Sequence, residues 1–293
     1  MNNNAILAAS HVDKDLGGRR ILSDISASVA AGSVIGVLGK NGAGKTTLLE
    51  IALGFSPVSG GTVQLWGHDS VKLPSPIKGR IGYVPQQNEL VPLLTGSQQL
   101  DLTASLYGNW DKALIGHLAK EWEVPLDRRI SVLSGGERQK ISMLLALGHR
   151  PELLVLDEPL ASLDPIARRS FLRQLLEITA DQTRAVIFSS HIISDLERVA
   201  NEIWILREGK MIWQGELDTL KESVVRLHLR AQQRLSGHLN VPHSLYQRIE
   251  GSTATVSVNR WQPSQAREIS KQLGVEVEVE SLDLEDIFLE LHR

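Results

Sequence analysis

The sequence contains no cysteine, so disulfide bonds and cysteine-based metal sites or nucleophiles are excluded. No apolar run approaches the ~18 residues that a bilayer-spanning helix needs. The N-terminal stretch lacks a basic segment followed by an apolar one, so we expect no secretory signal and a cytoplasmic protein that reaches a membrane only through a partner. The formal net charge of −3 provides no global basic field, so we expect no direct nucleic acid partner.

The length and composition are those of a globular protein. The 293 residues are enough for one large domain or two smaller ones, and 42% of them are hydrophobic. Short apolar runs at residues 34–38, 153–156, 185–188 and 203–206 predict buried strands. Their continuous apolarity favours parallel strands covered on both faces, and helical spacing between them predicts an α/β layered core.

Two further parts of the chain have their own character. Residues from about 88 to 150 are mostly helical in pattern and are typical of an inserted subdomain. From about residue 222, alternating stretches at 224–229, 253–258 and 275–279 predict strands, and residues 263–273 and 284–291 predict helices. We therefore expect one domain of residues 1–221 and a separate small α+β domain of residues 222–293.

Residues 39–46 read GKNGAGKT and fit the pattern G-x-x-x-x-G-K-[ST]. Glycines let the backbone turn tightly and bring N–H groups onto phosphates, and the helix that follows adds its positive end. Lys45 is expected to reach the β- and γ-phosphates of ATP, and Thr46 to ligate Mg²⁺. The residues expected to contact the nucleotide here are Gly39, Asn41, Gly42, Ala43, Gly44, Lys45, Thr46 and Thr47. A glycine-rich turn without a ligand is the alternative, and the strand and helix patterns around the loop argue against it.

Two acids follow the apolar run at 153–156. Ligands of open α/β sheets gather at the carboxyl ends of the strands. We therefore expect Asp157 to hold the Mg²⁺ shell and Glu158 to orient and polarise the water that attacks the γ-phosphate. A solvated turn with two surface acids is the alternative reading of this pair.

A second candidate anion site precedes a helix that we expect to start near Glu137. Ser134 and Glu137 form an S-x-x-E capping box, which explains both residues but not the glycines between them. Gly135 and Gly136 leave bare N–H groups at the positive end of a helix. We expect a second copy of the chain to dock here, so that ATP lies between the loop of one chain and residues 134–136 of the other.

Taken together, these motifs resemble the nucleotide-binding subunit of an ATP-binding cassette (ABC) transporter over roughly residues 5–220. The loop matches Walker A, residues 133–137 the signature, 153–158 Walker B, and 162–164 the D-loop with Asp164. Gln86, after IGYVP at 81–85, fits the Q-loop. His191, after two serines, fits the switch histidine.

The resemblance implies a P-loop NTPase core of mainly parallel sheet, with an antiparallel β subdomain and a helical subdomain. It implies two cassettes, as a homodimer or with a second cassette subunit, that hydrolyse ATP to drive integral membrane permease subunits from the inner face of the membrane. Gln86 would join the Mg²⁺ site, sense the γ-phosphate and relay to the permease. His191 would contact the γ-phosphate and support Glu158; a purely structural histidine is the alternative.

The ending SLDLEDIFLEL at 281–291 resembles the C-terminal extension of bacterial exporter ATPases, and residues 107–111 and 189–197 resemble cassettes of antimicrobial-peptide and drug exporters. The competing function is a soluble cassette ATPase acting on ribosomes or DNA. One cassette, a short insert and a net negative charge fit that function poorly. A non-hydrolysing binding module would lack Lys45, Glu158 or His191, and all three are present.

Two residues depart from the family's pattern. The signature ends in Glu137 instead of glutamine, which adds a charge that repels phosphate slightly. Leu16 stands where the resemblance places an aromatic ring that stacks on adenine. Stacking of this kind is worth roughly 1–3 kcal/mol, of which leucine recovers only a part. We therefore expect weaker ATP affinity or another stacking partner, and low discrimination among purine nucleotides.

Overall fold

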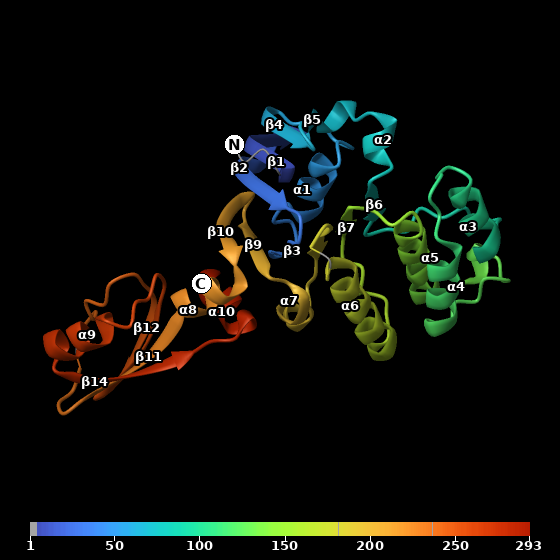
Figure 1. Ribbon diagram of the computed structural model, residues 1–293. Coiled ribbons are helices and arrows are strands. Elements are labelled where there is room, and N and C mark those ends of the chain that lie inside the picture. Colours follow the sequence, from blue (N-terminus) through green and yellow to red (C-terminus); the bar gives the residue numbers. More distant parts are fainter. Residues whose placement is uncertain (1–4, 181, 236) are drawn as a thin grey trace. The chain divides into compact units, whose positions relative to one another are not determined.

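The computed structural model describes residues 5–180, 182–235 and 237–293 (Figure 1). Residues 1–4 lie outside the described residues. They begin the N-terminal stretch in which we expect no secretory signal. The chain divides into two compact units, Met1–Gln214 and Gly215–Arg293. Among the residues described, no helix is long and apolar enough to cross a membrane.

A six-stranded sheet forms the centre of the first unit, in the order β10-β9-β3-β8-β7-β6. The five strands from β9 to β6 are parallel. All residues of β3, β7 and β8 are buried, which confirms the continuous apolar runs as strands covered on both faces. The strands are β3 (Val34–Leu38), β6 (Ile81–Val84), β7 (Leu153–Leu156), β8 (Ala185–Ser189), β9 (Glu202–Arg207) and β10 (Lys210–Glu216).

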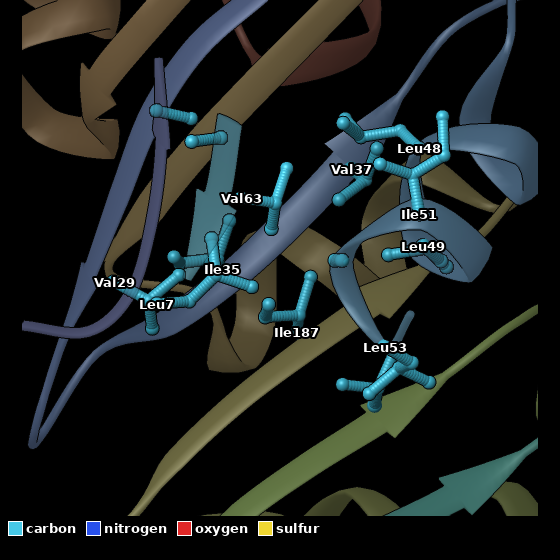
Figure 2. Packing of buried hydrophobic residues seen from close by; sticks show 14 of the residues in the cluster. Leu7, Val29, Ile35, Val37, Leu48, Leu49, Ile51, Leu53, Val63 and Ile187 are labelled. Atoms are coloured by element: carbon cyan, nitrogen blue, oxygen red, sulfur yellow. The ribbon is translucent and has the colours of Figure 1, made fainter. Parts of the chain in front are cut away.

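An antiparallel sheet packs against this core, in the order β2-β1-β4-β5. Its strands are β1 (Ala5–Leu16), β2 (Arg19–Ala30), β4 (Gly60–Leu65) and β5 (His68–Asp69). Figure 2 shows side chains of helix α1 (Lys45–Ala52), such as Leu48 and Ile51, in one apolar cluster with Val37 of β3 and Val63 of β4. This packing holds the start of α1 next to the end of β3.

Helices α3 (Gly96–Ala104), α4 (Lys112–Glu121) and α5 (Gly135–Leu147) form the helical subdomain expected within residues 88–150. The prediction that the last of these starts near Glu137 was two residues late, because Ser134 is the N-cap and α5 begins at Gly135. Helices α6 (Pro165–Thr179) and α7 (Ile193–Val199) follow β7 and β8. Short turns of helix, η1 (Ser70–Lys72), α2 (Ser75–Lys78) and η2 (Ile130–Val132), complete the unit.

The second unit is a four-stranded antiparallel sheet with helices, which confirms the predicted α+β character. The strand order is β12-β13-β11-β14, and apolar residues of β11 and β13 pack with Ile269 of α9. Sequence analysis missed β12 because none of its residues is buried and no apolar alternation marks it. The elements are α8 (Leu217–Ser223), β11 (Val225–Ala231), β12 (Ser244–Glu250), β13 (Thr253–Val258), α9 (Gln265–Leu273), β14 (Val275–Ser281) and α10 (Leu284–Leu291).

Candidate functional site

The glycine loop lies between β3 and α1, at the carboxyl end of the central strand. Gly42 and Gly44 have φ angles of 79° and 103°, in the left-handed region that side chains disfavour. A Cβ atom on Gly44 would lie 2.6 Å from Leu22 Cδ2, whereas one on Gly42 would meet nothing within 4 Å. Packing therefore fixes one side of the loop, and the other side faces open space that a ligand can occupy.

Lys45 and Thr46, the first residues of α1, are held by groups of the same chain. Lys45 Nζ donates to the carbonyl oxygen of Gly39 at 2.8 Å. Thr46 Oγ1 donates to Asp157 Oδ2 at 2.7 Å, and Asp157 is fully buried at the end of β7. A hydroxyl that donates its proton still has lone pairs for a cation. Asp157 therefore holds the Thr46 hydroxyl in one orientation, and a cation such as Mg²⁺, which prefers oxygen ligands, could bind to its free lone pairs.

A cleft of about 340 Å³ brings most of the predicted residues together. Its lining comprises Ile21, Asn41, Gly42, Gly44, Lys45, Thr46, Thr47, Gln86, Asp157 and Glu158. Within the described part of the chain there is no cluster of three or more His, Cys, Asp or Glu residues able to hold a metal. A cation in this cleft would therefore depend on Thr46, Gln86, Asp157 and the oxygen atoms of a bound phosphate.

The apolar side of the cleft differs from the expectation. Ile21 of β2 lines the cleft, whereas Leu16 does not belong to the lining and stands 52% exposed at the end of β1. No local pattern marks Ile21, because its place in the cleft depends on how β2 passes the loop. Both candidate positions for contact with the base, residues 16 and 21, thus carry aliphatic side chains.

Glu158 is held by His191 through its side chain and by Ser189 through its backbone N–H. Its φ angle is 51°, a strained value for a residue with a side chain. Its Oε2 atom accepts from the backbone N–H of His191 at 3.1 Å and lies 2.6 Å from His191 Nδ1, which therefore carries the proton. The side chain of His191 is 56% exposed, which argues against a purely structural core histidine.

Ser189, the last residue of β8, is a site residue that sequence analysis missed. Its Oγ donates to Asp157 Oδ1 at 2.6 Å and accepts from the backbone N–H of Glu158 at 2.9 Å. The side chain is fully buried. A polar residue at the end of the apolar run 185–188 was the available signal.

A groove extends from the cleft along Gln86. Its first part, of about 630 Å³, is lined by Thr46, Gln86, Tyr83 and Phe55 among others. A second part, of about 500 Å³, shares Tyr83 and Phe55 and continues to His149. Burial, and next to it the charge of Asp157, raises the pKa of Tyr83 to about 12, so its phenol is neutral. Phe55, which lines both parts, is 64% exposed, so the groove presents open apolar surface.

The second candidate anion site has a complete capping box. Ser134 Oγ accepts from Glu137 N–H at 3.2 Å, and Glu137 Oε2 accepts from Ser134 N–H at 2.7 Å. The bond from that backbone N–H is the main cause that lowers the pKa of Glu137, so the side chain is anionic. We expected both glycines to leave bare N–H groups for an anion, but at Gly136 a Cβ would lie 2.6 Å from Ser162 O. Close packing already requires that glycine, whereas Gly135 has only ordinary contacts at 3.8 Å.

The D-loop residue Asp164 serves as the N-cap of α6. Its Oδ1 accepts from the N–H groups of Ile166 and Ala167, both at 2.9 Å. The bond from Ala167, and after it the bond from Ile166, lowers the pKa of Asp164. Neither Asp164 nor residues 134–136 line the cleft at the glycine loop. One chain thus assembles the loop, Gln86 and the two acids, but does not bring the second helix start to them.

A parallel sheet whose central strand leads into a glycine loop and a helix, with a buried aspartate hydrogen-bonded to the first threonine of that helix, defines a P-loop nucleoside triphosphatase. Residues 22–161 match the family described as ABC transporter. The chain belongs to this family: it is an ATP-binding subunit of the ABC transporter type, and it is an ATPase.

Curated relatives and solved structures support this assignment. The chain is 30% identical to the Nod factor export ATP-binding protein I of Burkholderia lata, across 96% of this chain and 95% of that protein. It is 32% identical to the ABC transporter ATP-binding protein NatA of Bacillus subtilis, across 70% and 85%. An ATP-binding subunit of an ABC transporter matches at a TM-score of 0.66 and 27% identity, across 74% and 92%. A dimeric ATP-binding cassette bound to ADP and phosphate shares the fold, at a TM-score of 0.64 and 21% identity, across 72% and 98%.

Proposed function

We propose that this chain powers a separately encoded membrane permease from the cytoplasmic face of the membrane, and that the transported compound is a drug, an antimicrobial peptide or a similar molecule that is exported. The relatives named for Nod factor export align over 96% of this chain, so the likeness includes the C-terminal unit. The competing function, a soluble cassette that acts on ribosomes or DNA, draws no support from the names of the relatives above.

One cleft is lined by Lys45, Thr46, Asp157 and Glu158, and this observation supports their roles in ATP hydrolysis. Lys45 would place its charge on the β- and γ-phosphates, while the N–H groups of the loop cradle them. Thr46, Gln86 and Asp157 would hold Mg²⁺, which when bound neutralises charge that develops on the phosphates. Glu158, held by His191, would orient and polarise the attacking water.

The half of the site that one chain lacks is the anion site at Ser134, Gly135 and Gly136. We propose that a second cassette, either a copy of this chain or a related subunit, supplies these residues across a head-to-tail dimer. The dimeric cassette with ADP and phosphate is a precedent for such an assembly at the level of the fold. Hydrolysis by this chain would then require closure of two cassettes.

The groove beyond Gln86 is the surface proposed to meet the permease. Open apolar surface on a folded chain marks an interaction site. Phe55 and Val71 are exposed and both line the groove that begins at Thr46 and Gln86. An apolar segment of the permease in this groove would contact the same elements that contact the nucleotide. Gln86 would then pass the state of the γ-phosphate to the permease.

Residues 222–293 are proposed to be an accessory domain that stabilises the dimer or regulates the ATPase. The basis is a separate apolar core and sheet. Deletion of residues 222–293 is expected to weaken ATP-dependent dimerisation or to change the ATPase rate, measured by light scattering and phosphate release. Unchanged values for both quantities, in a truncated chain that keeps its thermal unfolding transition, would contradict this role.

The decisive test of the site is Glu158→Gln, because the amide keeps the shape and loses the charge that polarises water. Steady-state hydrolysis is expected to fall by more than about 100-fold, while ATP accumulates in a stable dimer. Glu250→Gln, an exposed acid on β12, is a matched control that should hydrolyse at the unaltered rate. Turnover near the wild-type rate in Glu158→Gln would sink the proposed role. Co-purification from native membranes would identify the permease.

A further inference from the structure

The hydroxyl of Ser189 is the middle link of a hydrogen-bond chain that joins separate motifs of the site. The chain runs from the N–H of Glu158 to Ser189 Oγ at 2.9 Å, and from that hydroxyl to Asp157 Oδ1 at 2.6 Å. The other oxygen of the same carboxylate accepts from Thr46 Oγ1 at 2.7 Å. One buried hydroxyl thereby touches both acids and, through Asp157, the proposed metal ligand.

The direction of each bond follows from the chemistry of the groups. An ionised carboxylate only accepts, so the single proton of the Ser189 hydroxyl lies on Asp157. The lone pairs of Ser189 are then available for the N–H of Glu158. No other arrangement of one proton satisfies both partners. The hydroxyl therefore fixes the plane of the Asp157 carboxylate and holds the backbone of Glu158 at the same time.

The register of the sheet explains why this serine reaches both acids. Strands β7 and β8 are parallel neighbours, with Leu156 opposite Phe188. The next residue along each strand, Asp157 and Ser189, therefore lies at the same level of the sheet edge. Glu158 follows with its strained φ of 51°, which persists only where neighbouring groups hold it.

We propose that Ser189 is a positioning residue for ATP hydrolysis: it keeps Asp157 directed at Thr46 and keeps the backbone turn that points Glu158 into the cleft. The inference rests on the roles proposed for Asp157 and Glu158. The alternative is a purely structural role, in which the buried hydroxyl of Ser189 only satisfies its hydrogen bonds and contributes to stability. The two readings differ in what a Ser189 variant does to metal dependence.

The test is Ser189→Ala, with Ser33→Ala as a matched control. Ser33 is also a buried serine whose Oγ donates to a carboxylate, Glu202 Oε1, at 2.6 Å. It precedes β3, at the end of the sheet opposite to the site. Both variants lose a bond from a buried hydroxyl to a carboxylate, and Ser189→Ala also leaves the N–H of Glu158 without this acceptor. The thermal unfolding temperature of the nucleotide-free chain should therefore fall in both variants, and at least as far in Ser189→Ala.

The expected difference lies in kinetics and in metal binding. In Ser189→Ala, kcat should fall about 10- to 100-fold, the usual loss when a residue that orients a metal ligand is removed. The Mg²⁺ concentration that half-saturates binding of a non-hydrolysable ATP analogue should rise by about tenfold or more. Ser33→Ala should leave both values within about twofold. Ser189→Cys keeps the size of the side chain with a weaker donor, and should lie between serine and alanine.

The outcomes separate this inference from the proposed function. Equal kcat and equal Mg²⁺ dependence in Ser189→Ala and Ser33→Ala would overturn the positioning role. Loss of turnover in Glu158→Gln alongside that result would leave the proposed function intact. Retained turnover in Glu158→Gln would instead remove the proposed function, whatever Ser189→Ala does. A Ser189→Ala loss that Ser189→Cys does not relieve at all would also count against the hydrogen-bond chain.

Discussion

The two glycine-containing helix starts of this chain differ in what binds their first backbone N–H groups. The start of α1 has Gly44 as its N-cap and no side-chain cap, so its first N–H groups are left for a ligand. The start of α5 is capped by its own Ser134 and Glu137. The first start is surrounded by Lys45, Thr46 and Asp157 of the same chain. The second start does not line the cleft, so we propose that it meets a nucleotide only across a dimer.

The largest expected effect comes from the α1 side. Lys45→Ala removes the point charge on the phosphates and the bond to Gly39 O, so ATP affinity should fall by more than about 100-fold and turnover should vanish. Isothermal titration calorimetry measures the affinity. Lys40→Ala is the matched control, since Lys40 is an exposed lysine of the same loop and does not line the cleft. Unchanged ATP affinity in Lys45→Ala would contradict the phosphate site.

A smaller and different effect is expected on the α5 side. Ser134→Ala should leave the ATP affinity of one chain within about twofold, and should lower kcat by roughly tenfold or more, because Ser134 would act only across the dimer. Loss of the cap should also cost about 1 kcal/mol of helix stability. Calorimetry, phosphate release and thermal unfolding measure the three quantities. If Ser134→Ala weakens ATP binding as much as Lys45→Ala does, both helix starts belong to one site within one chain, and the comparison fails.

Local sequence predicted the α1 side better than the rest of the site. Lys45, Thr46, Asp157 and Glu158 follow buried strands whose runs of apolar residues mark them, so their shared cleft follows from parallel strand ends. Ser189 was missed because its contacts depend on the register between β7 and β8, which no local pattern carries.

Contacts between segments that are distant in the sequence could not be predicted from local patterns either. Gly136 is required by the carbonyl group of Ser162, and Ile21 reaches the cleft because β2 passes the loop. In the fold, the continuous apolar runs at β3, β7, β8 and β9 and the alternating stretches at β11, β13 and β14 were predicted as strands. β12, which buries none of its residues, was not, and β1, β2 and β4 were not located from their own patterns although each buries residues. Sequence patterns thus located the strands with continuous apolar runs and some of the alternating ones, and missed features set by contacts between elements.

The smallest expected effect concerns the base rather than the phosphates. Leu16 is exposed and outside the lining of the cleft, so a tyrosine there adds a ring without disturbing the core. If residue 16 meets the adenine, Leu16→Tyr should tighten ATP binding by about 1 kcal/mol, roughly fivefold, and Leu16→Ala should weaken it. GTP should gain about as much as ATP, because stacking does not distinguish the bases. Calorimetry with both nucleotides would check this, and Leu245→Tyr, another exposed leucine, is the control. Equal affinities for tyrosine, leucine and alanine would show that residue 16 does not meet the base, and would leave the side of Ile21 as the place where the chain contacts it.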